Sequence, residues 1–526
     1  MKKIIYIISF FIIFSSCENL IEEEVFTSLD SETLYENVSG CEAALAGVYG
    51  EFTKHGYYGT IFPELTLNLS GIYTAQTTQV DNRFGISAST AFIGTHWGAV
   101  WQIIARANDV IYHVSKSTIN EEVKNRILGE AYFIRAKNYF DLVRLWGGVP
   151  LRLEPSTSST IHMERAPASK VYDQIISDLE MAKKLLPEPA KAPVGRPHRF
   201  AANALAQKVY LTLAGNDPSS TYWQKSIDEG LIVYNSKAYS LMRPFAALWE
   251  LKNKNSKESI FEIQGSTVNT GDGASLTRLF LPGTGNPSSS LTPKADTWGR
   301  AKVNKEVYDG HVRQYPRDPR IDFTYLDSTY RNRTTNALVN IYPITKTGFN
   351  SFTYIRKYVD PDYLGTSSNT NVMYMRYAEV LIMLAEAENE LRGPAGAFLY
   401  INELISRARD ANGNGKDDAT ELSPANWTNL NQSVFRDRIL SEYRYELLGE
   451  LDEYFSVRRR GKSYFKTLLD AHNAYPAVIA NAGAFRLDFI APTDDATMNR
   501  IMLLPIPVTE MSTNNRIKQA DQNPGY

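Results

Sequence analysis

The segment DANGNGKDDATE, residues 410–421, has the residue types and the spacing of a calcium-binding loop. It matches the pattern D-x-[DN]-x-[DN]-G-x5-E at every specified position. Such a loop takes side-chain oxygens from positions 1, 3 and 5, a backbone carbonyl from position 7 and a bidentate carboxylate from position 12. The candidate metal ligands are therefore Asp410, Asn412, Asn414, Lys416 through its carbonyl oxygen and Glu421, with a water held by Asp418 at position 9.

A calcium ion in this loop would have a structural role, because the chain itself fills every ligand position. The alternative is a polar loop between two helices whose composition imitates the pattern. Pro424 favours this alternative, because a proline there would interrupt a helix that left the loop directly. Both interpretations stay open at the level of the sequence.

Two loop regions combine aromatic and polar side chains in a way that suits sugar binding. A flat aromatic face can pack on the C–H groups of a pyranose ring, while carboxylate, amide or guanidinium groups bond its hydroxyls. The candidate ligand-binding residues are Tyr73, Gln76, Asp81, Asn82, Arg83 and Trp97 in the first region, and Trp298, Arg300 and Tyr325 in the second. Trp97 has an alternative as a core residue, because it stands one helical turn before Trp101.

The sequence carries no recognised catalytic motif. The seven histidines are scattered, and there is no H-E-x-x-H, C-x-x-C, G-x-S-x-G, P-loop or dinucleotide-binding motif. A glycosidase carboxylate pair is defined by its separation in space, so an unrecognised glycoside hydrolase remains the alternative. We expect a protein that is not an enzyme and has no catalytic cofactor. A formal net charge of −2 also argues against nucleic acid as a partner.

These candidate residues must be positioned by a mostly helical scaffold, which we place mainly at residues 97–261 and 372–460. Helical segments rich in Ala, Leu and Tyr occur there in pairs of the size of tetratricopeptide (TPR) repeats. Residues 262–371 are rich in Gly, Pro, Ser, Thr and Asn, and this stretch is too long for one structureless loop. We predict that it is an insert with short strands and functional loops. No linker separates these regions, so residues 41–526 are expected to form a single domain.

The N-terminus has the pattern of a bacterial lipoprotein signal. Lys2 and Lys3 precede an apolar run that is too short to span a membrane, and two serines lead to Cys17. We therefore predict a signal peptide at residues 1–16, lipidation of Cys17, and an acidic tether over residues 17–40. An ordinary secretory signal with an incidental cysteine is the alternative.

An ordered set of motifs then resembles a known family over essentially the whole mature chain. The motifs are ARANDVI, GEAYFIRAKNYFDLVRLWGGVPL, RDPR, MRYAEVLIMLAEAENEL, YRYELLGE, SVRRRG, LLPIPVTEM and a terminal NPGY. Together with the lipoprotein cysteine, they resemble the SusD/RagB family of surface nutrient-binding lipoproteins from Bacteroidota.

The resemblance implies a mostly α, SusD-like fold with four TPR-like helix pairs and a loop-rich ligand-binding side that carries short strands. It also implies a surface-exposed position on the outer membrane and a SusC-like TonB-dependent transporter as the partner, on which the protein acts as a lid. Its ligand would be an oligosaccharide or polysaccharide, or a peptide as in the RagB branch, and no reaction would be catalysed. A helical scaffold that only assembles other proteins is a further alternative.

Overall fold

A computed structural model shows how the chain is folded. It describes residues 31–75, 84–158, 160–268, 276–283, 291–326, 330–332, 335–339, 353–416, 421–476, 478 and 493–526. None of the helices in these ranges combines the length and the apolar composition needed to span a lipid bilayer. The predicted signal peptide, Cys17 and residues 17–30 of the predicted tether lie outside the described residues.

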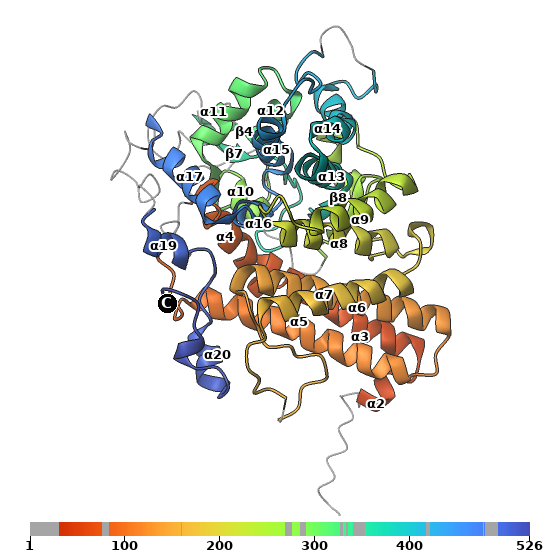
Figure 1. The fold of residues 1–526 in the computed structure, drawn as a ribbon. Coiled ribbons are helices and arrows are strands. Elements are labelled where there is room, and N and C mark those ends of the chain that lie inside the picture. Colours follow the sequence, from red (N-terminus) through yellow and green to blue (C-terminus); the bar gives the residue numbers. More distant parts are fainter. Residues whose placement is uncertain are drawn as a thin grey trace, which may run out of the picture.

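Helices packed in successive pairs form the scaffold of the described part of the chain (Figure 1). The helix α3 packs on α5, α6 on α7, α8 on α9, and α13 on α14, and further contacts between α5 and α6, α7 and α8, and α9 and α13 join the pairs. The structure therefore confirms the mostly helical fold with four TPR-like helix pairs. The bounds are Val38–Gly50 for α3, Ala91–Lys116 for α5, Glu121–Trp146 for α6, Ala168–Leu185 for α7, Arg199–Ala214 for α8, Tyr222–Ser236 for α9, Tyr377–Arg392 for α13 and Pro394–Arg409 for α14.

Helix α6 shows how local sequence defines a scaffold helix. The side chain of Asn120 accepts a hydrogen bond from the backbone N–H of Glu122 at 3.0 Å, which caps the N-terminus. The helix ends at Gly147, whose φ of 73° lies in the left-handed region that favours glycine. Because α6 packs against both α5 and α7, even Lys137 and Asp141 are buried, and they pair with each other at 2.8 Å. Helix α6 is therefore a buried helix. Its apolar residues make up only part of the surface that packs against the neighbouring helices.

The region between α9 and α13 carries short strands, as predicted for the loop-rich side, and one further strand, β1, comes from the segment before α5. The described strands form two-stranded antiparallel ribbons. These pair β1 Tyr73–Ala75 with β3 Ala301–Val303, β2 Ser259–Ile263 with β8 Val372–Arg376, β4 Tyr325–Leu326 with β7 Tyr354–Ile355, and β5 Tyr330–Arg331 with β6 Leu338–Val339. Three short helices, which the sequence did not suggest, lie in the same region: α10 Leu276–Phe280, α11 Lys305–Gln314 and α12 Pro319–Thr324.

The remaining helical segments complete the structure. The α-helices are α2 Ser31–Leu34, α4 Ile61–Asn68, α15 Gln432–Leu447, α16 Glu453–Arg459, α17 Gly461–Asn473, α19 Asp495–Arg500 and α20 Val508–Thr513. Tighter or wider turns are η2 Glu51–Thr53, η3 His55–Gly59, η4 Pro189–Lys191, η5 Phe245–Trp249, η6 Leu251–Asn253 and η8 Gln519–Asp521.

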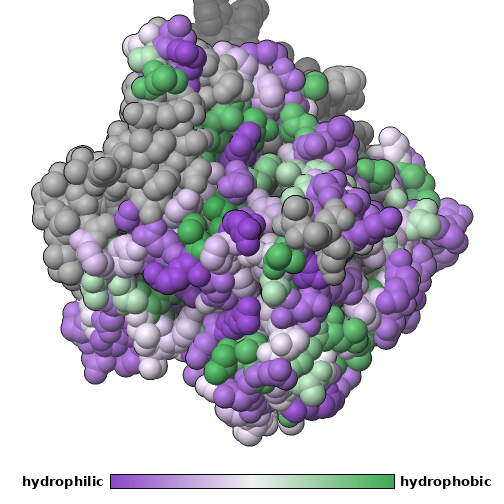
Figure 2. Space-filling model, turned by 90° about the horizontal axis from the view of Figure 1, so that it is seen from above, coloured by the Kyte–Doolittle hydropathy of each residue, from purple (hydrophilic) through white to green (hydrophobic). Residues whose placement is uncertain are grey.

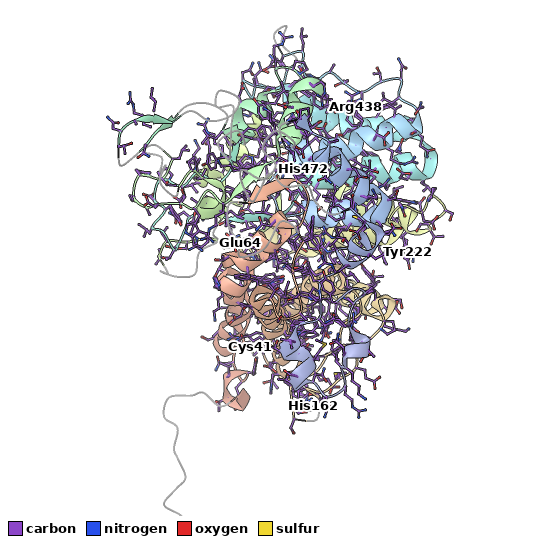
Figure 3. The ribbon with its side chains drawn as sticks, turned by 90° about the vertical axis from the view of Figure 1, so that its left-hand side faces the viewer. Cys41, Glu64, His162, Tyr222, Arg438 and His472 are labelled. Atoms are coloured by element: carbon purple, nitrogen blue, oxygen red, sulfur yellow. The ribbon has the colours of Figure 1, made fainter. Side chains whose placement is uncertain are left out.

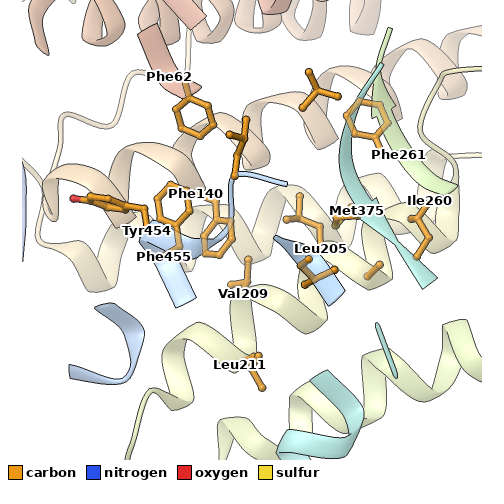
Figure 4. Packing of buried hydrophobic residues seen from close by; sticks show 14 of the residues in the cluster. Phe62, Phe140, Leu205, Val209, Leu211, Ile260, Phe261, Met375, Tyr454 and Phe455 are labelled. Atoms are coloured by element: carbon orange, nitrogen blue, oxygen red, sulfur yellow. The ribbon is translucent and has the colours of Figure 1, made fainter. Parts of the chain in front are cut away.

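One main hydrophobic core connects these elements, with buried side chains from Tyr35 to Ile517. Figure 4 shows part of it, where Phe62 of α4 and Phe140 of α6 lie close to Phe455 of α16. The rings of Phe62 and Phe455 are stacked with their centroids 6.2 Å apart. Segments far apart in the sequence are thus held together around α4, the helix that leads toward the loop-rich side.

A buried network of ion pairs fixes the loop-rich side to the scaffold. Arg320 of α12, Arg376 of β8 and Arg407 of α14 all pair with Glu446 of α15, and these four side chains are almost fully buried. Burial alone raises the pKa of Glu446, but the three guanidinium groups reverse this effect and hold it well below the usual range of a glutamate. Further buried partners are Glu258, Asp318, Glu442, Glu450 and Lys357.

Candidate functional site

Trp298 and Arg300 form a half-exposed aromatic and cationic surface just before β3. The guanidinium carbons of Arg278 and Arg300 lie 3.8 and 3.7 Å from the centroid of the Trp298 ring. These distances are typical of cation–π contacts. The backbone N–H of Trp298 donates to the carbonyl oxygen of Arg278 at 2.7 Å, which ties this loop to α10. The structure therefore brings together two residues that were predicted as one group.

Glu64 of α4, which is labelled in Figure 3, supports this surface through its ion pair with Arg300. Its Oε1 accepts a hydrogen bond from Nη1 of Arg300 at 3.0 Å, whereas its Oε2 is buried without a hydrogen-bond partner in the described part of the chain. Burial raises the pKa of Glu64, and Arg300 opposes this shift. Nη2 of Arg278 donates to Oγ1 of Thr60 at 2.8 Å. We call Trp298, Arg300, Arg278 and Glu64 the Trp298 platform.

Arg278 and Glu64 were not predicted from the sequence. Arg278 lies in the apolar stretch LTRLF and Glu64 in the helix IFPELTLN, and neither segment contains a binding motif. The only signal for them is unusual polarity inside an apolar segment, which marks a group that needs a partner but does not identify that partner.

Three other predicted ligand residues are wrong as surface contacts, because the structure buries them. Tyr73, Trp97 and Tyr325 expose 3%, 3% and 1% of their surface. Tyr73 donates to a carboxylate oxygen of Glu453, and its own hydroxyl accepts from the backbone N–H of Gly449 at 2.7 Å. These contacts place Tyr73 in the polar part of the core, where it has no face for a sugar.

Trp97 and Tyr325 are buried for related reasons. The indole N–H of Trp97 donates to Glu510 Oε2 at 3.0 Å, and its ring meets that of Trp146 edge to face with centroids 5.0 Å apart. The hydroxyl of Tyr325 lies 3.2 Å from Nδ1 of His311. The core alternative therefore holds for Trp97. The other four residues predicted in the first region, Gln76, Asp81, Asn82 and Arg83, lie outside the described residues, so their role stays a prediction.

An open pocket of about 430 Å³ lies between α11, α15 and α17 and is a second candidate site. Its lining includes Tyr445 and Tyr464 together with Arg313, Gln314 and Arg444. Sequence reasoning missed it, because its residues come from three helices that are far apart in the chain. Figure 2 looks onto the molecule from above, where hydrophobic residues form small patches among hydrophilic ones.

The predicted calcium loop adopts a compact turn over its described positions. The carboxylate of Asp410 accepts hydrogen bonds from the backbone N–H groups of Gly413 at 2.7 Å and Gly415 at 3.0 Å. Gly415, at position 6 of the loop, has a φ of 75°. Oε1 of Glu421 accepts from the backbone N–H of Ala411 at 2.8 Å, so both ends of the loop are close together. No cluster of three or more His, Cys, Asp or Glu side chains that could hold a metal occurs among the described residues, which exclude the acids at 417 and 418.

Comparison with known proteins gives consistent similarities across the chain. A sequence profile described as "SusD family" matches residues 257–526, and one described as "Starch-binding associating with outer membrane" matches residues 22–211. The SusD-like protein P2 of Formosa agariphila is 28% identical, with all of both chains covered.

Solved structures share the fold. A SusD homologue from Bacteroides thetaiotaomicron has a TM-score of 0.80 at 20% identity, covering 96% of this chain and 100% of that one. A laminarin-binding SusD-like protein has a TM-score of 0.69 at 22% identity, covering 94% and 100%. Surface glycan-binding protein A from Bacteroides fluxus has a TM-score of 0.70 at 22% identity, covering 93% and 99%.

Proposed function

The chain belongs to the SusD family, and on that premise we propose that it is a surface-exposed lipoprotein that captures oligosaccharides or polysaccharides. In this proposal it delivers them, acting as a lid, to a SusC-like TonB-dependent transporter. Capture is its whole task, and no bond in the ligand is broken.

The observation that carries the glycan assignment is the Trp298 platform. It holds a partly exposed indole with two guanidinium groups stacked over its ring, on the loop-rich side. A sugar can contact the exposed part of the indole while the guanidinium groups donate to its hydroxyls or to acidic groups. Structural neighbours described as laminarin-binding and surface glycan-binding support the same ligand class.

Binding without catalysis agrees with the carboxylates at this platform. Glycoside hydrolysis usually needs two carboxyl groups that flank the scissile bond, about 5–10 Å apart. Glu64 is the only carboxylate that we find in contact with the platform among the described residues, and it pairs with Arg300. Its remaining oxygen is buried, so it is poorly placed to donate a proton to a ligand.

Attachment to the membrane and the transporter partnership are supported by other features. The pattern that ends at Cys17 favours a lipid anchor there, and the profile over residues 22–211 is described as associating with the outer membrane. A protein anchored beside a transporter meets its entrance at a high effective concentration, so modest ligand affinity suffices for delivery.

The proposal can be tested with purified protein lacking residues 1–17 and a panel of laminarin, starch and a mixed peptide digest. We expect saturable binding to at least one glycan by isothermal titration calorimetry, and no new products when the same mixtures are separated by chromatography. Binding to peptides alone would favour the peptide-binding alternative. Release of shorter sugars that stops after substitution of one carboxylate would show an enzyme and overturn the proposal.

A further inference from the structure

We propose that the loop of residues 410–421 is a calcium-binding site. The loop connects α14 to the segment that leads into α15, and both helices contribute to the buried ion-pair network. A cation held in this loop would therefore stabilise the junction between the scaffold and the loop-rich side.

The backbone of the loop has the arrangement that a calcium loop of this pattern requires. Asn412 Oδ1 accepts from the N–H of Asn414 at 2.9 Å, and Asn414 Oδ1 accepts from the N–H of Lys416 at 2.7 Å. With Asp410 at position 1, the side chains at positions 1, 3 and 5 thus curl around the same turn. Gly415 takes the positive φ at position 6, where the pattern demands glycine.

An independent observation points to a missing ligand. Glu421 is 93% buried, since only 7% of its surface is exposed, and its Oε2 has no hydrogen-bond partner in the described structure. Its other oxygen is held by the N–H groups of Ala411 and Asn412, which directs the carboxylate toward the start of the loop. A buried carboxylate oxygen without a partner is costly, and a bound cation would satisfy it. Position 12 is where the pattern places the bidentate carboxylate.

Arg243 is the group that competes with a metal ion. Its Nη1 lies 2.6 Å from Oδ2 of Asp410, and the loop packs closely on this segment at Gly413. Because a metal ion must compete with the arginine that pairs with Asp410, we expect calcium affinity in the range of extracellular modules, with a Kd of about 10⁻⁴–10⁻³ M. Magnesium should bind less well, because it demands a small octahedral site, which the larger ring of carboxylate, amide and carbonyl oxygens in this loop pattern does not provide.

The test compares thermal unfolding and calorimetric titration of the chelator-treated protein with CaCl2 and with MgCl2. We expect 10 mM CaCl2 to raise the Tm by about 1–3 °C and MgCl2 to have a smaller effect. Glu421→Gln should abolish the calcium-dependent shift. Arg243→Gln should lower the Tm without metal and tighten calcium binding several-fold, because it removes the competing charge.

Asp494→Asn is the matched control, because the Asp494 carboxylate also accepts a backbone hydrogen bond, from Thr497 at the N-terminus of α19, but lies outside the loop. It should keep the full calcium-dependent shift. The proposal is overturned if the unsubstituted protein shows neither heat of binding nor a Tm shift with CaCl2. It is also overturned if Glu421→Gln retains the shift, since calcium would then bind elsewhere.

A second inference concerns the class of glycan and rests on the proposed function. The Trp298 platform contains two guanidinium groups but only one described carboxylate, that of Glu64, which pairs with Arg300. Arg278 donates only to Thr60, and its Nε is buried without a partner in the described part of the chain. Guanidinium groups favour carboxylate and sulfate groups, which they can bond at two points. We infer that the platform prefers an acidic polysaccharide that carries such groups.

Calorimetry with alginate, κ-carrageenan and laminarin tests this inference and separates uronate from sulfate ligands. We expect at least tenfold tighter binding of one acidic polymer than of laminarin, weakened by 500 mM NaCl. Arg278→Gln should remove most of this preference, whereas Arg516→Gln, at an exposed arginine elsewhere, should not. Equal or tighter laminarin binding would overturn the inference while leaving glycan capture intact. Binding to none of these polymers or to any glycan of the wider panel would instead count against the proposed function.

Discussion

At the scale of single residues, Glu453 is a buried acid whose charge state changes near neutral pH. It lies at the start of α16, where it accepts hydrogen bonds from Tyr73 and from the backbone N–H of Gly449. Burial raises its pKa to about 7, although these hydrogen bonds oppose the shift. The folded protein therefore keeps a proton on Glu453 at pH values where the unfolded chain has released it.

This difference predicts a pH dependence of stability that Glu453→Gln removes. Below the unfolded pKa of 4.5, the acid is protonated in both states and imposes no penalty. Between pH 4.5 and 7, its contribution to the free energy of unfolding falls as the pH rises, by about 3 kcal/mol in total. Urea unfolding at several pH values should show that the free energy of unfolding of the wild type falls by about 3 kcal/mol relative to that of Glu453→Gln as the pH rises. If the difference in the free energy of unfolding between the two proteins stays constant from pH 4 to 8, the account is contradicted.

Trp97 and Trp298 show what sequence could and could not predict at this scale. Both stand in segments where aromatic and polar residues mix, and only the helical spacing of Trp97 from Trp101 gives a reason to separate them. Trp97 is buried because Trp146 and Glu510 pack against it, and neither contact can be derived from the local pattern. Trp298 stays half exposed because two arginines, one of them in α10, hold it at the surface.

Trp97→Phe should therefore lower stability without changing ligand affinity. The substitution removes the hydrogen bond to Glu510 and part of the edge-to-face packing, so we expect a loss of about 1–3 kcal/mol in the free energy of unfolding. Chemical denaturation measures the loss, and calorimetry of the folded variant measures the affinity. A tenfold weaker affinity with intact folding would return Trp97 to the list of ligand contacts.

At the scale of elements, the long scaffold helices were predictable, whereas the short helices α10, α11 and α12 and the pairing of the strands were not. Capping by Asn120 and termination at Gly147 are local signals, and they specify α6 before any tertiary contact is known. The β1–β3 ribbon joins Tyr73 to Val303, and nothing in either segment specifies the other. The Trp298 platform depends on that long-range arrangement, because Glu64 lies in α4, the helix that precedes β1, and Arg300 lies directly before β3.

The buried ion-pair network should dominate the stability of the junction between these elements. Arg376→Met leaves Glu446, Glu450 and Glu258 with fewer cations in a buried site. We expect a loss of about 3–5 kcal/mol, because the remaining buried charges lose their compensation. Lys170→Met, which breaks an exposed pair with Asp173, is the control and should change stability by less than about 1 kcal/mol. Similar effects of both substitutions in chemical denaturation would refute this role of the network.

At the scale of the whole molecule, the proposed function requires that the protein is held at the membrane by a lipid. In the native host, Cys17→Ala should shift the protein from the outer-membrane fraction to soluble fractions and abolish labelling with radioactive palmitate. The described helices provide no span that could replace the anchor. Retention of the substituted protein in the membrane fraction would show that another element attaches it.

The central claim is that the Trp298 platform captures a glycan, and one comparison of affinities tests it most directly. The affinity of Trp298→Ala for the best glycan of the panel is measured by calorimetry beside that of Trp97→Phe, after circular dichroism has shown both variants to be folded. The account predicts at least tenfold weaker binding for Trp298→Ala, because the variant loses the indole contact with the sugar and the ring that holds Arg278 and Arg300 in place, and an unchanged affinity for Trp97→Phe. An unchanged affinity of Trp298→Ala would contradict the account and move the site elsewhere, with the pocket between α11, α15 and α17 as the next candidate.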